Sequence, residues 1–142
     1  MEKIPVLVNP KSKYFKADKN LQRYINNGLR KIYITIRQFE EEGVPFEKIF
    51  NCDALIYDKI GNYYTFKHRD NDNTQLRILY TYQKDANGTY QLKLIHFKVK
   101  RNNDKEYIKF FTDYISNFSD NEDLYKEIKI WKKYWQIKEN MV

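Results

Sequence analysis

The sequence predicts an α+β domain, with one long N-terminal helix packed on a four-stranded antiparallel meander and followed by two C-terminal helices. Three observations lead to this prediction. The 142 residues fit one domain, residues 1–142. Apolar residues recur at helical spacing near the N-terminus, and β-rich segments separated by turn residues follow in the middle. The low Gly and Pro content beside 13 Tyr and 9 Phe favours a folded core over disorder.

The N-terminal helix is predicted over residues 17–42. Its apolar positions are Leu21, Tyr24, Ile25, Gly28, Ile32, Ile36 and Phe39. The segment Gly43-Val44-Pro45 then supplies a stop signal. Residues 1–16 hold two prolines and a short apolar run, so we expect an extended arm or an edge strand there.

The predicted meander occupies the middle of the chain. Its strands are expected at residues 52–58, 62–69, 75–83 and 90–100. Asn87-Gly88 is its strongest hairpin signal.

Residues 104–140 form the predicted C-terminal helical extension. One helix is indicated by Tyr107, Ile108, Phe111, Tyr114, Ile115 and Phe118, and another by capping-box spacing at residues 119–122 before Leu124, Ile128, Trp131 and Trp135.

The charge balance favours a polyanionic partner. Lys and Arg number 26 against 19 Asp and Glu, a net charge of +7, which suits RNA, DNA or an acidic protein.

The sequence contains no Gly-rich phosphate loop, no Gly-x-Ser-x-Gly elbow and no His-Glu-x-x-His motif, so we expect no cofactor and no metal. The single cysteine, Cys52, is expected to be a small buried hydrophobe in a reducing compartment. No apolar run is long enough to span a bilayer, and a cytoplasmic location is expected.

Strand 62–69 and strand 75–83 combine an apolar face with a charged one. If residues 69 and 75 close the hairpin, Phe66 lies opposite Ile78, and Lys67 lies opposite Arg77. Arg69 then joins Lys67 and Arg77 on one face. Like charges directly opposite each other destabilise a sheet, so an anion such as a phosphodiester is the natural neutralising partner. The alternative is that these long side chains splay into water at little cost.

The next strand, residues 90–100, has two possible registers. Pairing Gln83 with Tyr90 would bury Ile95 and Phe97, place His96 opposite Arg77, and add His96 and Lys98 to the charged face. A slip of one residue would instead bury His96 together with Leu92 and Leu94.

Two short motifs resemble the RelE/HigB-like toxins of bacterial and phage toxin–antitoxin systems. They are QLRILYTYQ at residues 75–83 and LKLIHFKVKR at residues 92–101. The first is similar to the family's central-strand pattern of aromatic, Arg, two aliphatics and Tyr, except at its first position. The second is similar to the His or basic run that often ends the next strand in the family. The resemblance covers roughly residues 17–111.

The resemblance implies a metal-independent endoribonuclease, an mRNA interferase that often acts on ribosome-bound mRNA and is inhibited by a cognate antitoxin. On that basis Arg77 would hold the scissile phosphate, Lys67 and Arg69 would supply further cations, and His96 would exchange protons. The expected nucleic-acid contacts are Lys98, Lys100, Arg101 and, with its side chain toward the core, His68.

Two other functions stay open at this point. A non-catalytic basic binding protein, such as a phage-encoded inhibitor of a nucleic-acid enzyme or a protein that coats RNA or DNA, needs only the basic surface. A structural or assembly protein has only the aromatic content in its favour.

Overall fold

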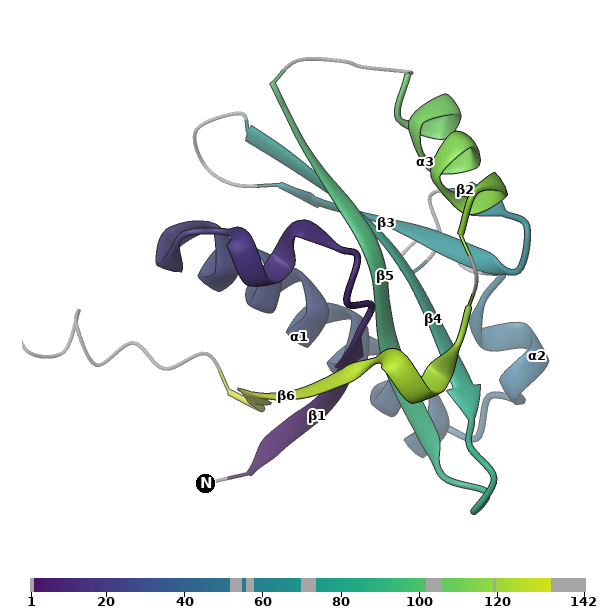
Figure 1. The fold of residues 1–142 in the computed structure, drawn as a ribbon. Coiled ribbons are helices and arrows are strands. Elements are labelled where there is room, and N and C mark those ends of the chain that lie inside the picture. Colours follow the sequence, from purple (N-terminus) through teal and green to yellow (C-terminus); the bar gives the residue numbers. More distant parts are fainter. Residues whose placement is uncertain are drawn as a thin grey trace, which may run out of the picture.

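The computed structural model describes residues 2–51, 55, 58–69, 74–101, 106–118 and 120–133, and it shows a mixed six-stranded sheet with a helix against each face (Figure 1). The strands are β1 (Lys3–Val8), β2 (Asp58–Ile60), β3 (Tyr63–Arg69), β4 (Thr74–Lys84), β5 (Tyr90–Arg101) and β6 (Lys126–Trp131). The α-helices are α1 (Lys19–Glu41), α2 (Phe46–Ile49) and α3 (Tyr107–Ser116), and two short 3₁₀ helices are η1 (Lys13–Lys16) and η2 (Glu122–Leu124). The strand order across the sheet is β2-β3-β4-β5-β1-β6.

The long N-terminal helix predicted from the sequence is present as α1. It begins after Asp18, whose carboxylate accepts a hydrogen bond of 2.8 Å from the backbone N–H of Leu21. It ends before Gly43, which has φ of +80° and reverses the chain at the helix C-terminus. Gly28 lies where α1 packs tightly on the sheet, since a Cβ there would stand 2.6 Å from Cδ1 of Ile78.

The prediction of a four-stranded antiparallel meander is wrong, because both ends of the chain add strands to the sheet. Residues 3–8, within the expected arm, form β1, which pairs in parallel with β5 and antiparallel with β6. The side chains of β1 alternate, with Ile4, Val6 and Val8 buried, so this segment satisfies the period of a strand inside a sheet. Pro5 is tolerated there although β1 has neighbours on both sides.

The second C-terminal helix is also wrong, because β6 occupies part of that segment. The sequence Lys126–Trp131 alternates, with Ile130 buried and Ile128 half-buried between exposed charged residues. The apolar spacing of residues 124, 128 and 131 is also compatible with a helix. The segment forms a strand because it pairs with the edge of β1 that β5 leaves open. Ser119 and Trp135, which also contributed to the prediction, lie outside the described residues.

The hairpin of β3 and β4 has the predicted register, with Lys67 opposite Arg77 and Phe66 opposite Ile78. The strand expected at 52–58 is described only from Asp58, where the short edge strand β2 begins. Asn87 and Gly88 lie in the turn between β4 and β5, and Gly88 has φ of +82°.

The pairing of β4 with β5 follows neither register considered from the sequence. A bulge beside Leu79 and Tyr80 shifts the register by one residue partway along the ladder. On one side of the bulge Tyr80 pairs with Leu94, and on the other Leu79 pairs with His96. Leu92, Leu94 and Phe97 therefore all reach the same core, which no uniform register could achieve.

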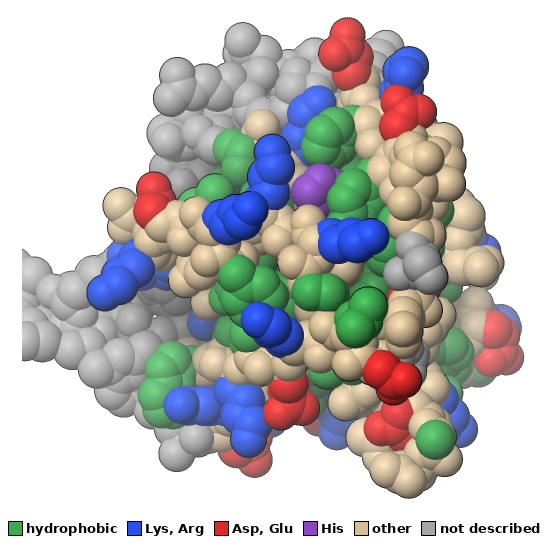
Figure 2. Space-filling model, in the orientation of Figure 1, with side chains coloured by type: hydrophobic (Ala, Val, Ile, Leu, Met, Phe, Trp, Pro, Cys, Tyr) green, Lys and Arg blue, Asp and Glu red, His purple; other side chains and the backbone are tan. Residues whose placement is uncertain are grey.

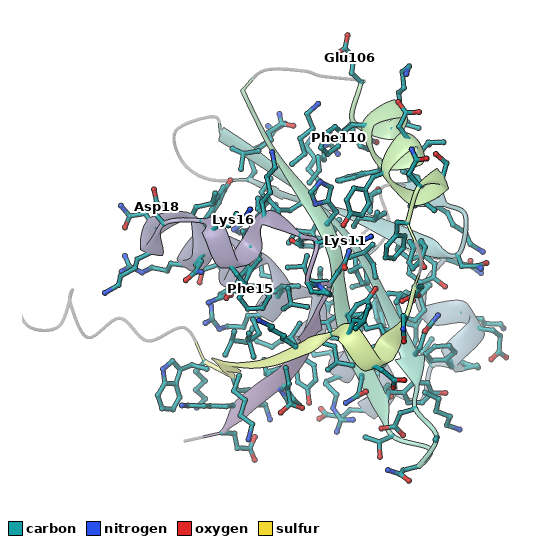
Figure 3. All side chains as sticks on the ribbon, in the orientation of Figure 1. Lys11, Phe15, Lys16, Asp18, Glu106 and Phe110 are labelled. Atoms are coloured by element: carbon teal, nitrogen blue, oxygen red, sulfur yellow. The ribbon has the colours of Figure 1, made fainter. Side chains whose placement is uncertain are left out.

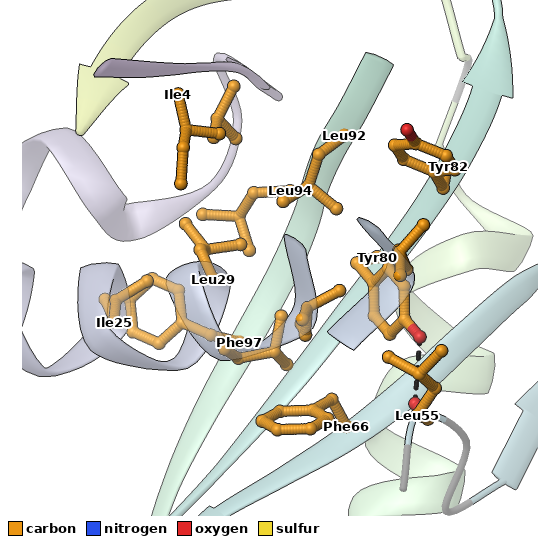
Figure 4. Packing of buried hydrophobic residues seen from close by; sticks show 14 of the residues in the cluster. Ile4, Ile25, Leu29, Leu55, Phe66, Tyr80, Tyr82, Leu92, Leu94 and Phe97 are labelled. Atoms are coloured by element: carbon orange, nitrogen blue, oxygen red, sulfur yellow. Dashed lines mark hydrogen bonds between the residues drawn. The ribbon is translucent and has the colours of Figure 1, made fainter. Parts of the chain in front are cut away.

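The larger core lies between α1 and one face of the sheet. Ile25, Leu29, Ile32 and Ile36 of α1 pack with the apolar side chains of β1, β3, β4 and β5 (Figure 4). Tyr80 is fully buried there, and its hydroxyl donates a hydrogen bond of 2.8 Å to the backbone carbonyl of Leu55.

A second, smaller core forms on the opposite face, under α3. Tyr107 and Phe111 of α3 pack against Leu79, Ile95 and other buried residues of β2–β5. This is the face that the sequence predicted to be an open, charged surface. The helix covers much of it, and this decides what the cations on that face can do.

Candidate nucleic-acid interface

The cations predicted on the sheet lie in a row across three strands. Lys67 on β3 pairs with Arg77 on β4, and Arg77 pairs with Lys98 on β5. The bulge places Lys98, and not His96, opposite Arg77. The three side chains point to the face that carries α3.

Arg77 is buried beneath α3, with 3% of its surface exposed. Its guanidinium carbon lies 4.3 Å from the ring centre of Tyr107, a cation–π contact that ties β4 to the helix. A side chain this enclosed cannot meet a phosphate unless α3 moves. The role of phosphate ligand expected for Arg77 is therefore not available in this conformation.

His96 is enclosed in the same way and is 4% exposed. Its ring is stacked on Tyr114 at 4.1 Å and on Phe110 at 5.2 Å. Burial, together with the smaller effect of the nearby positive charge of Lys13, lowers the pKa of His96 from 6.5 to about 4. His96 is thus neutral near pH 7, and its Nδ1 has no hydrogen-bond partner among the described residues.

The other predicted site residues differ in how much of their side chains is exposed. His68 is buried on the α1 face, as expected from the hairpin register, and its ring contacts that of Tyr24 at 4.9 Å. Arg69 is exposed and Lys67 half-exposed at the end of the hairpin. The backbones of Lys100 and Arg101 end β5, and their side chains lie outside the described residues.

A different set of residues forms an exposed basic surface, and the view of Figure 2 is the one in which Figure 3 labels Phe15 and Phe110. Three large aromatic side chains are exposed among the described residues, Phe15 (40%), Phe110 (39%) and Trp131 (42%). Trp131 follows Ile130, which is buried in the core against α1, so its side chain points to the opposite face of the sheet. Each of the three aromatic side chains has a lysine Nζ over its ring: Lys126 at 5.3 Å from Phe15, Lys98 at 4.6 Å from Phe110, and Lys3 at 4.4 Å from Trp131. We call these three units the lysine–aromatic pairs.

The segment between β1 and α1 adds further cations beside these pairs. Lys11, Lys13 and Lys16 are all exposed, and in Figure 3 Lys11 and Lys16 lie between Phe15 and Phe110. In Figure 2 the lysines and arginines are spread among hydrophobic patches, while most Asp and Glu side chains lie near the margin of the view. The face therefore presents positive charge interleaved with aromatic surface.

Hydrogen bonds fix this segment on the sheet. Asn9 is buried, and its Nδ2 donates to the backbone carbonyl of Ile95 at 3.1 Å and to the hydroxyl oxygen of Tyr114 at 2.5 Å. Ser12 caps η1, with its hydroxyl accepting from the backbone N–H of Tyr14 at 3.2 Å. The lysines of the segment are thereby held on a defined backbone.

Of the residues in the three pairs, the sequence predicted only Lys98 as a contact, because residues 1–16 were interpreted as an extended arm or an edge strand and residues 104–140 as a helical extension. One signal was available. The run PKSKYFK, residues 10–16, places two aromatic residues among three lysines, a combination typical of nucleic-acid contacts. Trp131 and Phe110 could not be assigned to a surface without knowing which elements surround them.

Comparisons with known protein families, with curated proteins and with solved structures found no match. None of the described helices is long and apolar enough to cross a membrane. Over residues 2–133, gaps in the description aside, no group of three or more His, Cys, Asp or Glu is arranged to hold a metal ion.

Proposed function

We propose that this protein binds single-stranded RNA on the face that carries the three lysine–aromatic pairs, without cleaving it. The observation that carries the proposal is the repetition of one unit, an exposed ring with a lysine ammonium above it, on β6, η1 and α3. Bases stack on aromatic rings whatever their sequence, and lysines contact the phosphates between them. Such a surface suits a flexible single strand, whose bases are accessible, better than a duplex, whose bases are stacked on each other.

Charge supports the same proposal. The chain carries a net charge of +7, and Lys11, Lys13 and Lys16 add to the charge beside the aromatic rings. Neutralising phosphates releases counterions, so affinity should fall steeply with salt.

The buried state of Arg77 and His96 favours binding over catalysis. Cleavage at a ribose 2′-OH needs an acid, a base and a cation that reach the phosphate together. Both side chains are at least nine-tenths buried, and His96 is neutral near pH 7. Binding requires neither of them to be exposed.

Fluorescence anisotropy of a labelled oligouridylate tests the proposal. Phe15→Ala and Phe110→Ala should each raise the Kd about 5- to 150-fold, since a stacked base contributes about 1–3 kcal/mol. Ile108→Ala is the matched control, because Ile108 is an equally exposed residue of α3 whose aliphatic side chain offers no ring on which a base can stack. Wild-type protein that binds neither RNA nor single-stranded DNA would refute the proposal.

An endoribonuclease is the second candidate, and one observation favours it. Lys67, Arg77 and Lys98 lie side by side across β3, β4 and β5, so a movement of α3 would present three cations to one phosphate. The test is cleavage of labelled RNA in the presence of a metal chelator. Cleavage that Arg77→Gln abolishes in a folded protein would favour the enzyme, and intact RNA that remains bound would favour the binding protein.

A further inference from the structure

Beside the lysine–aromatic pair of Phe110 the surface is hollowed into a cleft of about 400 Å³. Six residues line it: Lys11, Phe110, Asp113, Tyr114, Asn117 and Phe118. The volume lies within the range of small-ligand sites. In Figure 3 the labelled Lys11 and Phe110 lie on either side of this region.

The cleft has one apolar wall and a polar rim. Phe110, Tyr114 and Phe118 are spaced by four residues along α3 and the turn that follows it, so their rings form a continuous stripe. Tyr114 is held in place, because its ring stacks on His96 and its hydroxyl receives the hydrogen bond from Asn9. A flat aromatic ligand would therefore meet a preformed surface.

The polar rim offers mostly acceptors. Asp113 is an exposed carboxylate, which can only accept. Asn117 donates one N–H of its Nδ2 to the backbone carbonyl of Asp113 at 3.1 Å, and its amide oxygen can accept while its second N–H can donate. Lys11 supplies the donor on the other side of the cleft.

Among the bases, guanine has the matching edge. Its N1–H and its N2 amino group are adjacent donors that can bind the two oxygens of one carboxylate, while its O6 accepts from an ammonium. Adenine, uracil and cytosine each lack two adjacent donors on that edge. We infer that this cleft is a guanine-binding pocket, in which Asp113 reads the Watson–Crick edge of a base unstacked from the bound strand.

The inference rests on the proposed binding of single-stranded RNA and adds base preference to it. Within the described part of the chain, the carboxylate of Asp113 has one competing contact, its ion pair with Lys109 at 2.8 Å. Both side chains are exposed, so this pair contributes little to stability. The carboxylate also keeps lone pairs for a second donor on the same oxygen.

Competition between three oligonucleotides tests the inference: an oligouridylate, the same oligomer with one central guanosine, and the same oligomer with inosine at that position. Inosine lacks the N2 amino group. Wild-type protein should bind the guanosine oligomer roughly 5- to 100-fold more tightly than the oligouridylate, with the inosine oligomer in between. Equal binding of all three would overturn the pocket and leave the proposed strand binding intact, whereas no binding of any would overturn both.

Two variants assign the preference to the carboxylate. Asp113→Asn should remove the guanosine preference and keep the affinity for oligouridylate. Lys109→Gln is the matched control, because it removes the same ion pair and leaves the carboxylate, so it should keep the preference. Preference retained in Asp113→Asn, or lost in Lys109→Gln, would overturn the assignment.

Discussion

Acidification should destabilise this protein through His96. The pKa of His96 is lowered from 6.5 to about 4 because the side chain is buried. In the unfolded chain the imidazole regains its ordinary pKa, so between pH 6.5 and pH 4 the unfolded state binds a proton that the folded state does not. The free energy of unfolding therefore rises with pH between pH 4 and pH 6.5. Above pH 6.5 the titration of His96 no longer changes it.

The magnitude follows from the size of the shift. The difference of about 2.5 pH units corresponds to about 3.5 kcal/mol in full, at about 1.4 kcal/mol for each unit, and about 3 kcal/mol of this unfolding free energy is lost between pH 7 and pH 4. That is a large fraction of the stability of a domain this size. The physical cost is that of placing an imidazolium between Tyr114 and Phe110, beside Lys13.

Urea unfolding followed by circular dichroism, from pH 4 to pH 7.5, measures this effect. His96→Phe keeps a planar ring in the stack and removes the titration, so the difference between its stability and that of the wild type should change by about 3 kcal/mol across the window. Carboxylates titrate in both proteins and cancel in the difference. Parallel stability curves for the two proteins would refute the reasoning.

Four other outcomes are expected. Phe111→Ala should lower the unfolding free energy by about 3–5 kcal/mol, because Phe111 is fully buried in the core under α3, and urea unfolding checks this. Asp18→Ala should cost about 1 kcal/mol through loss of the α1 cap, with Asp18→Ser as the variant that restores it. Asn9→Ala should cost about 1–3 kcal/mol, because it leaves the buried carbonyl of Ile95 without its donor. Replacing Lys13 and Lys16 by Gln should reduce the slope of log K for RNA binding against log salt concentration by about 1.4. The same change at Lys31 and Lys48, which are exposed on α1 and α2, should leave this slope unchanged. Anisotropy titrations at several salt concentrations measure both slopes.

Local patterns predicted α1 and the β3–β4 hairpin, because each is determined by residues close in sequence. The spacing from Leu21 to Phe39 and the stop signal at Gly43 are sufficient for the helix. The register of Lys67 with Arg77 follows from the alternation of apolar residues on two adjacent strands.

Distant pairing was not predictable in the same way. β1 becomes a strand inside the sheet because β5 and β6 flank it, and neither partner is recognisable from residues 3–8. The bulge beside Leu79 changes which side chains of β5 face which core, and no residue there signals it. The bulge also placed Lys98 opposite Arg77, and the packing of α3 on the sheet, another contact between distant segments, buried Arg77.

The position of β1 has a consequence for synthesis on the ribosome. Val6 pairs with Leu92, so 86 residues separate the two positions (92 − 6). At about 5–20 residues per second, roughly 4–17 s pass between their emergence. During that time Ile4, Val6 and Val8 lack the strand that will cover one side of their backbone, and β6 is made later still. The first strand therefore stays unpaired until β5 and β6 have been made, and its three apolar side chains remain available to other apolar surfaces in the meantime.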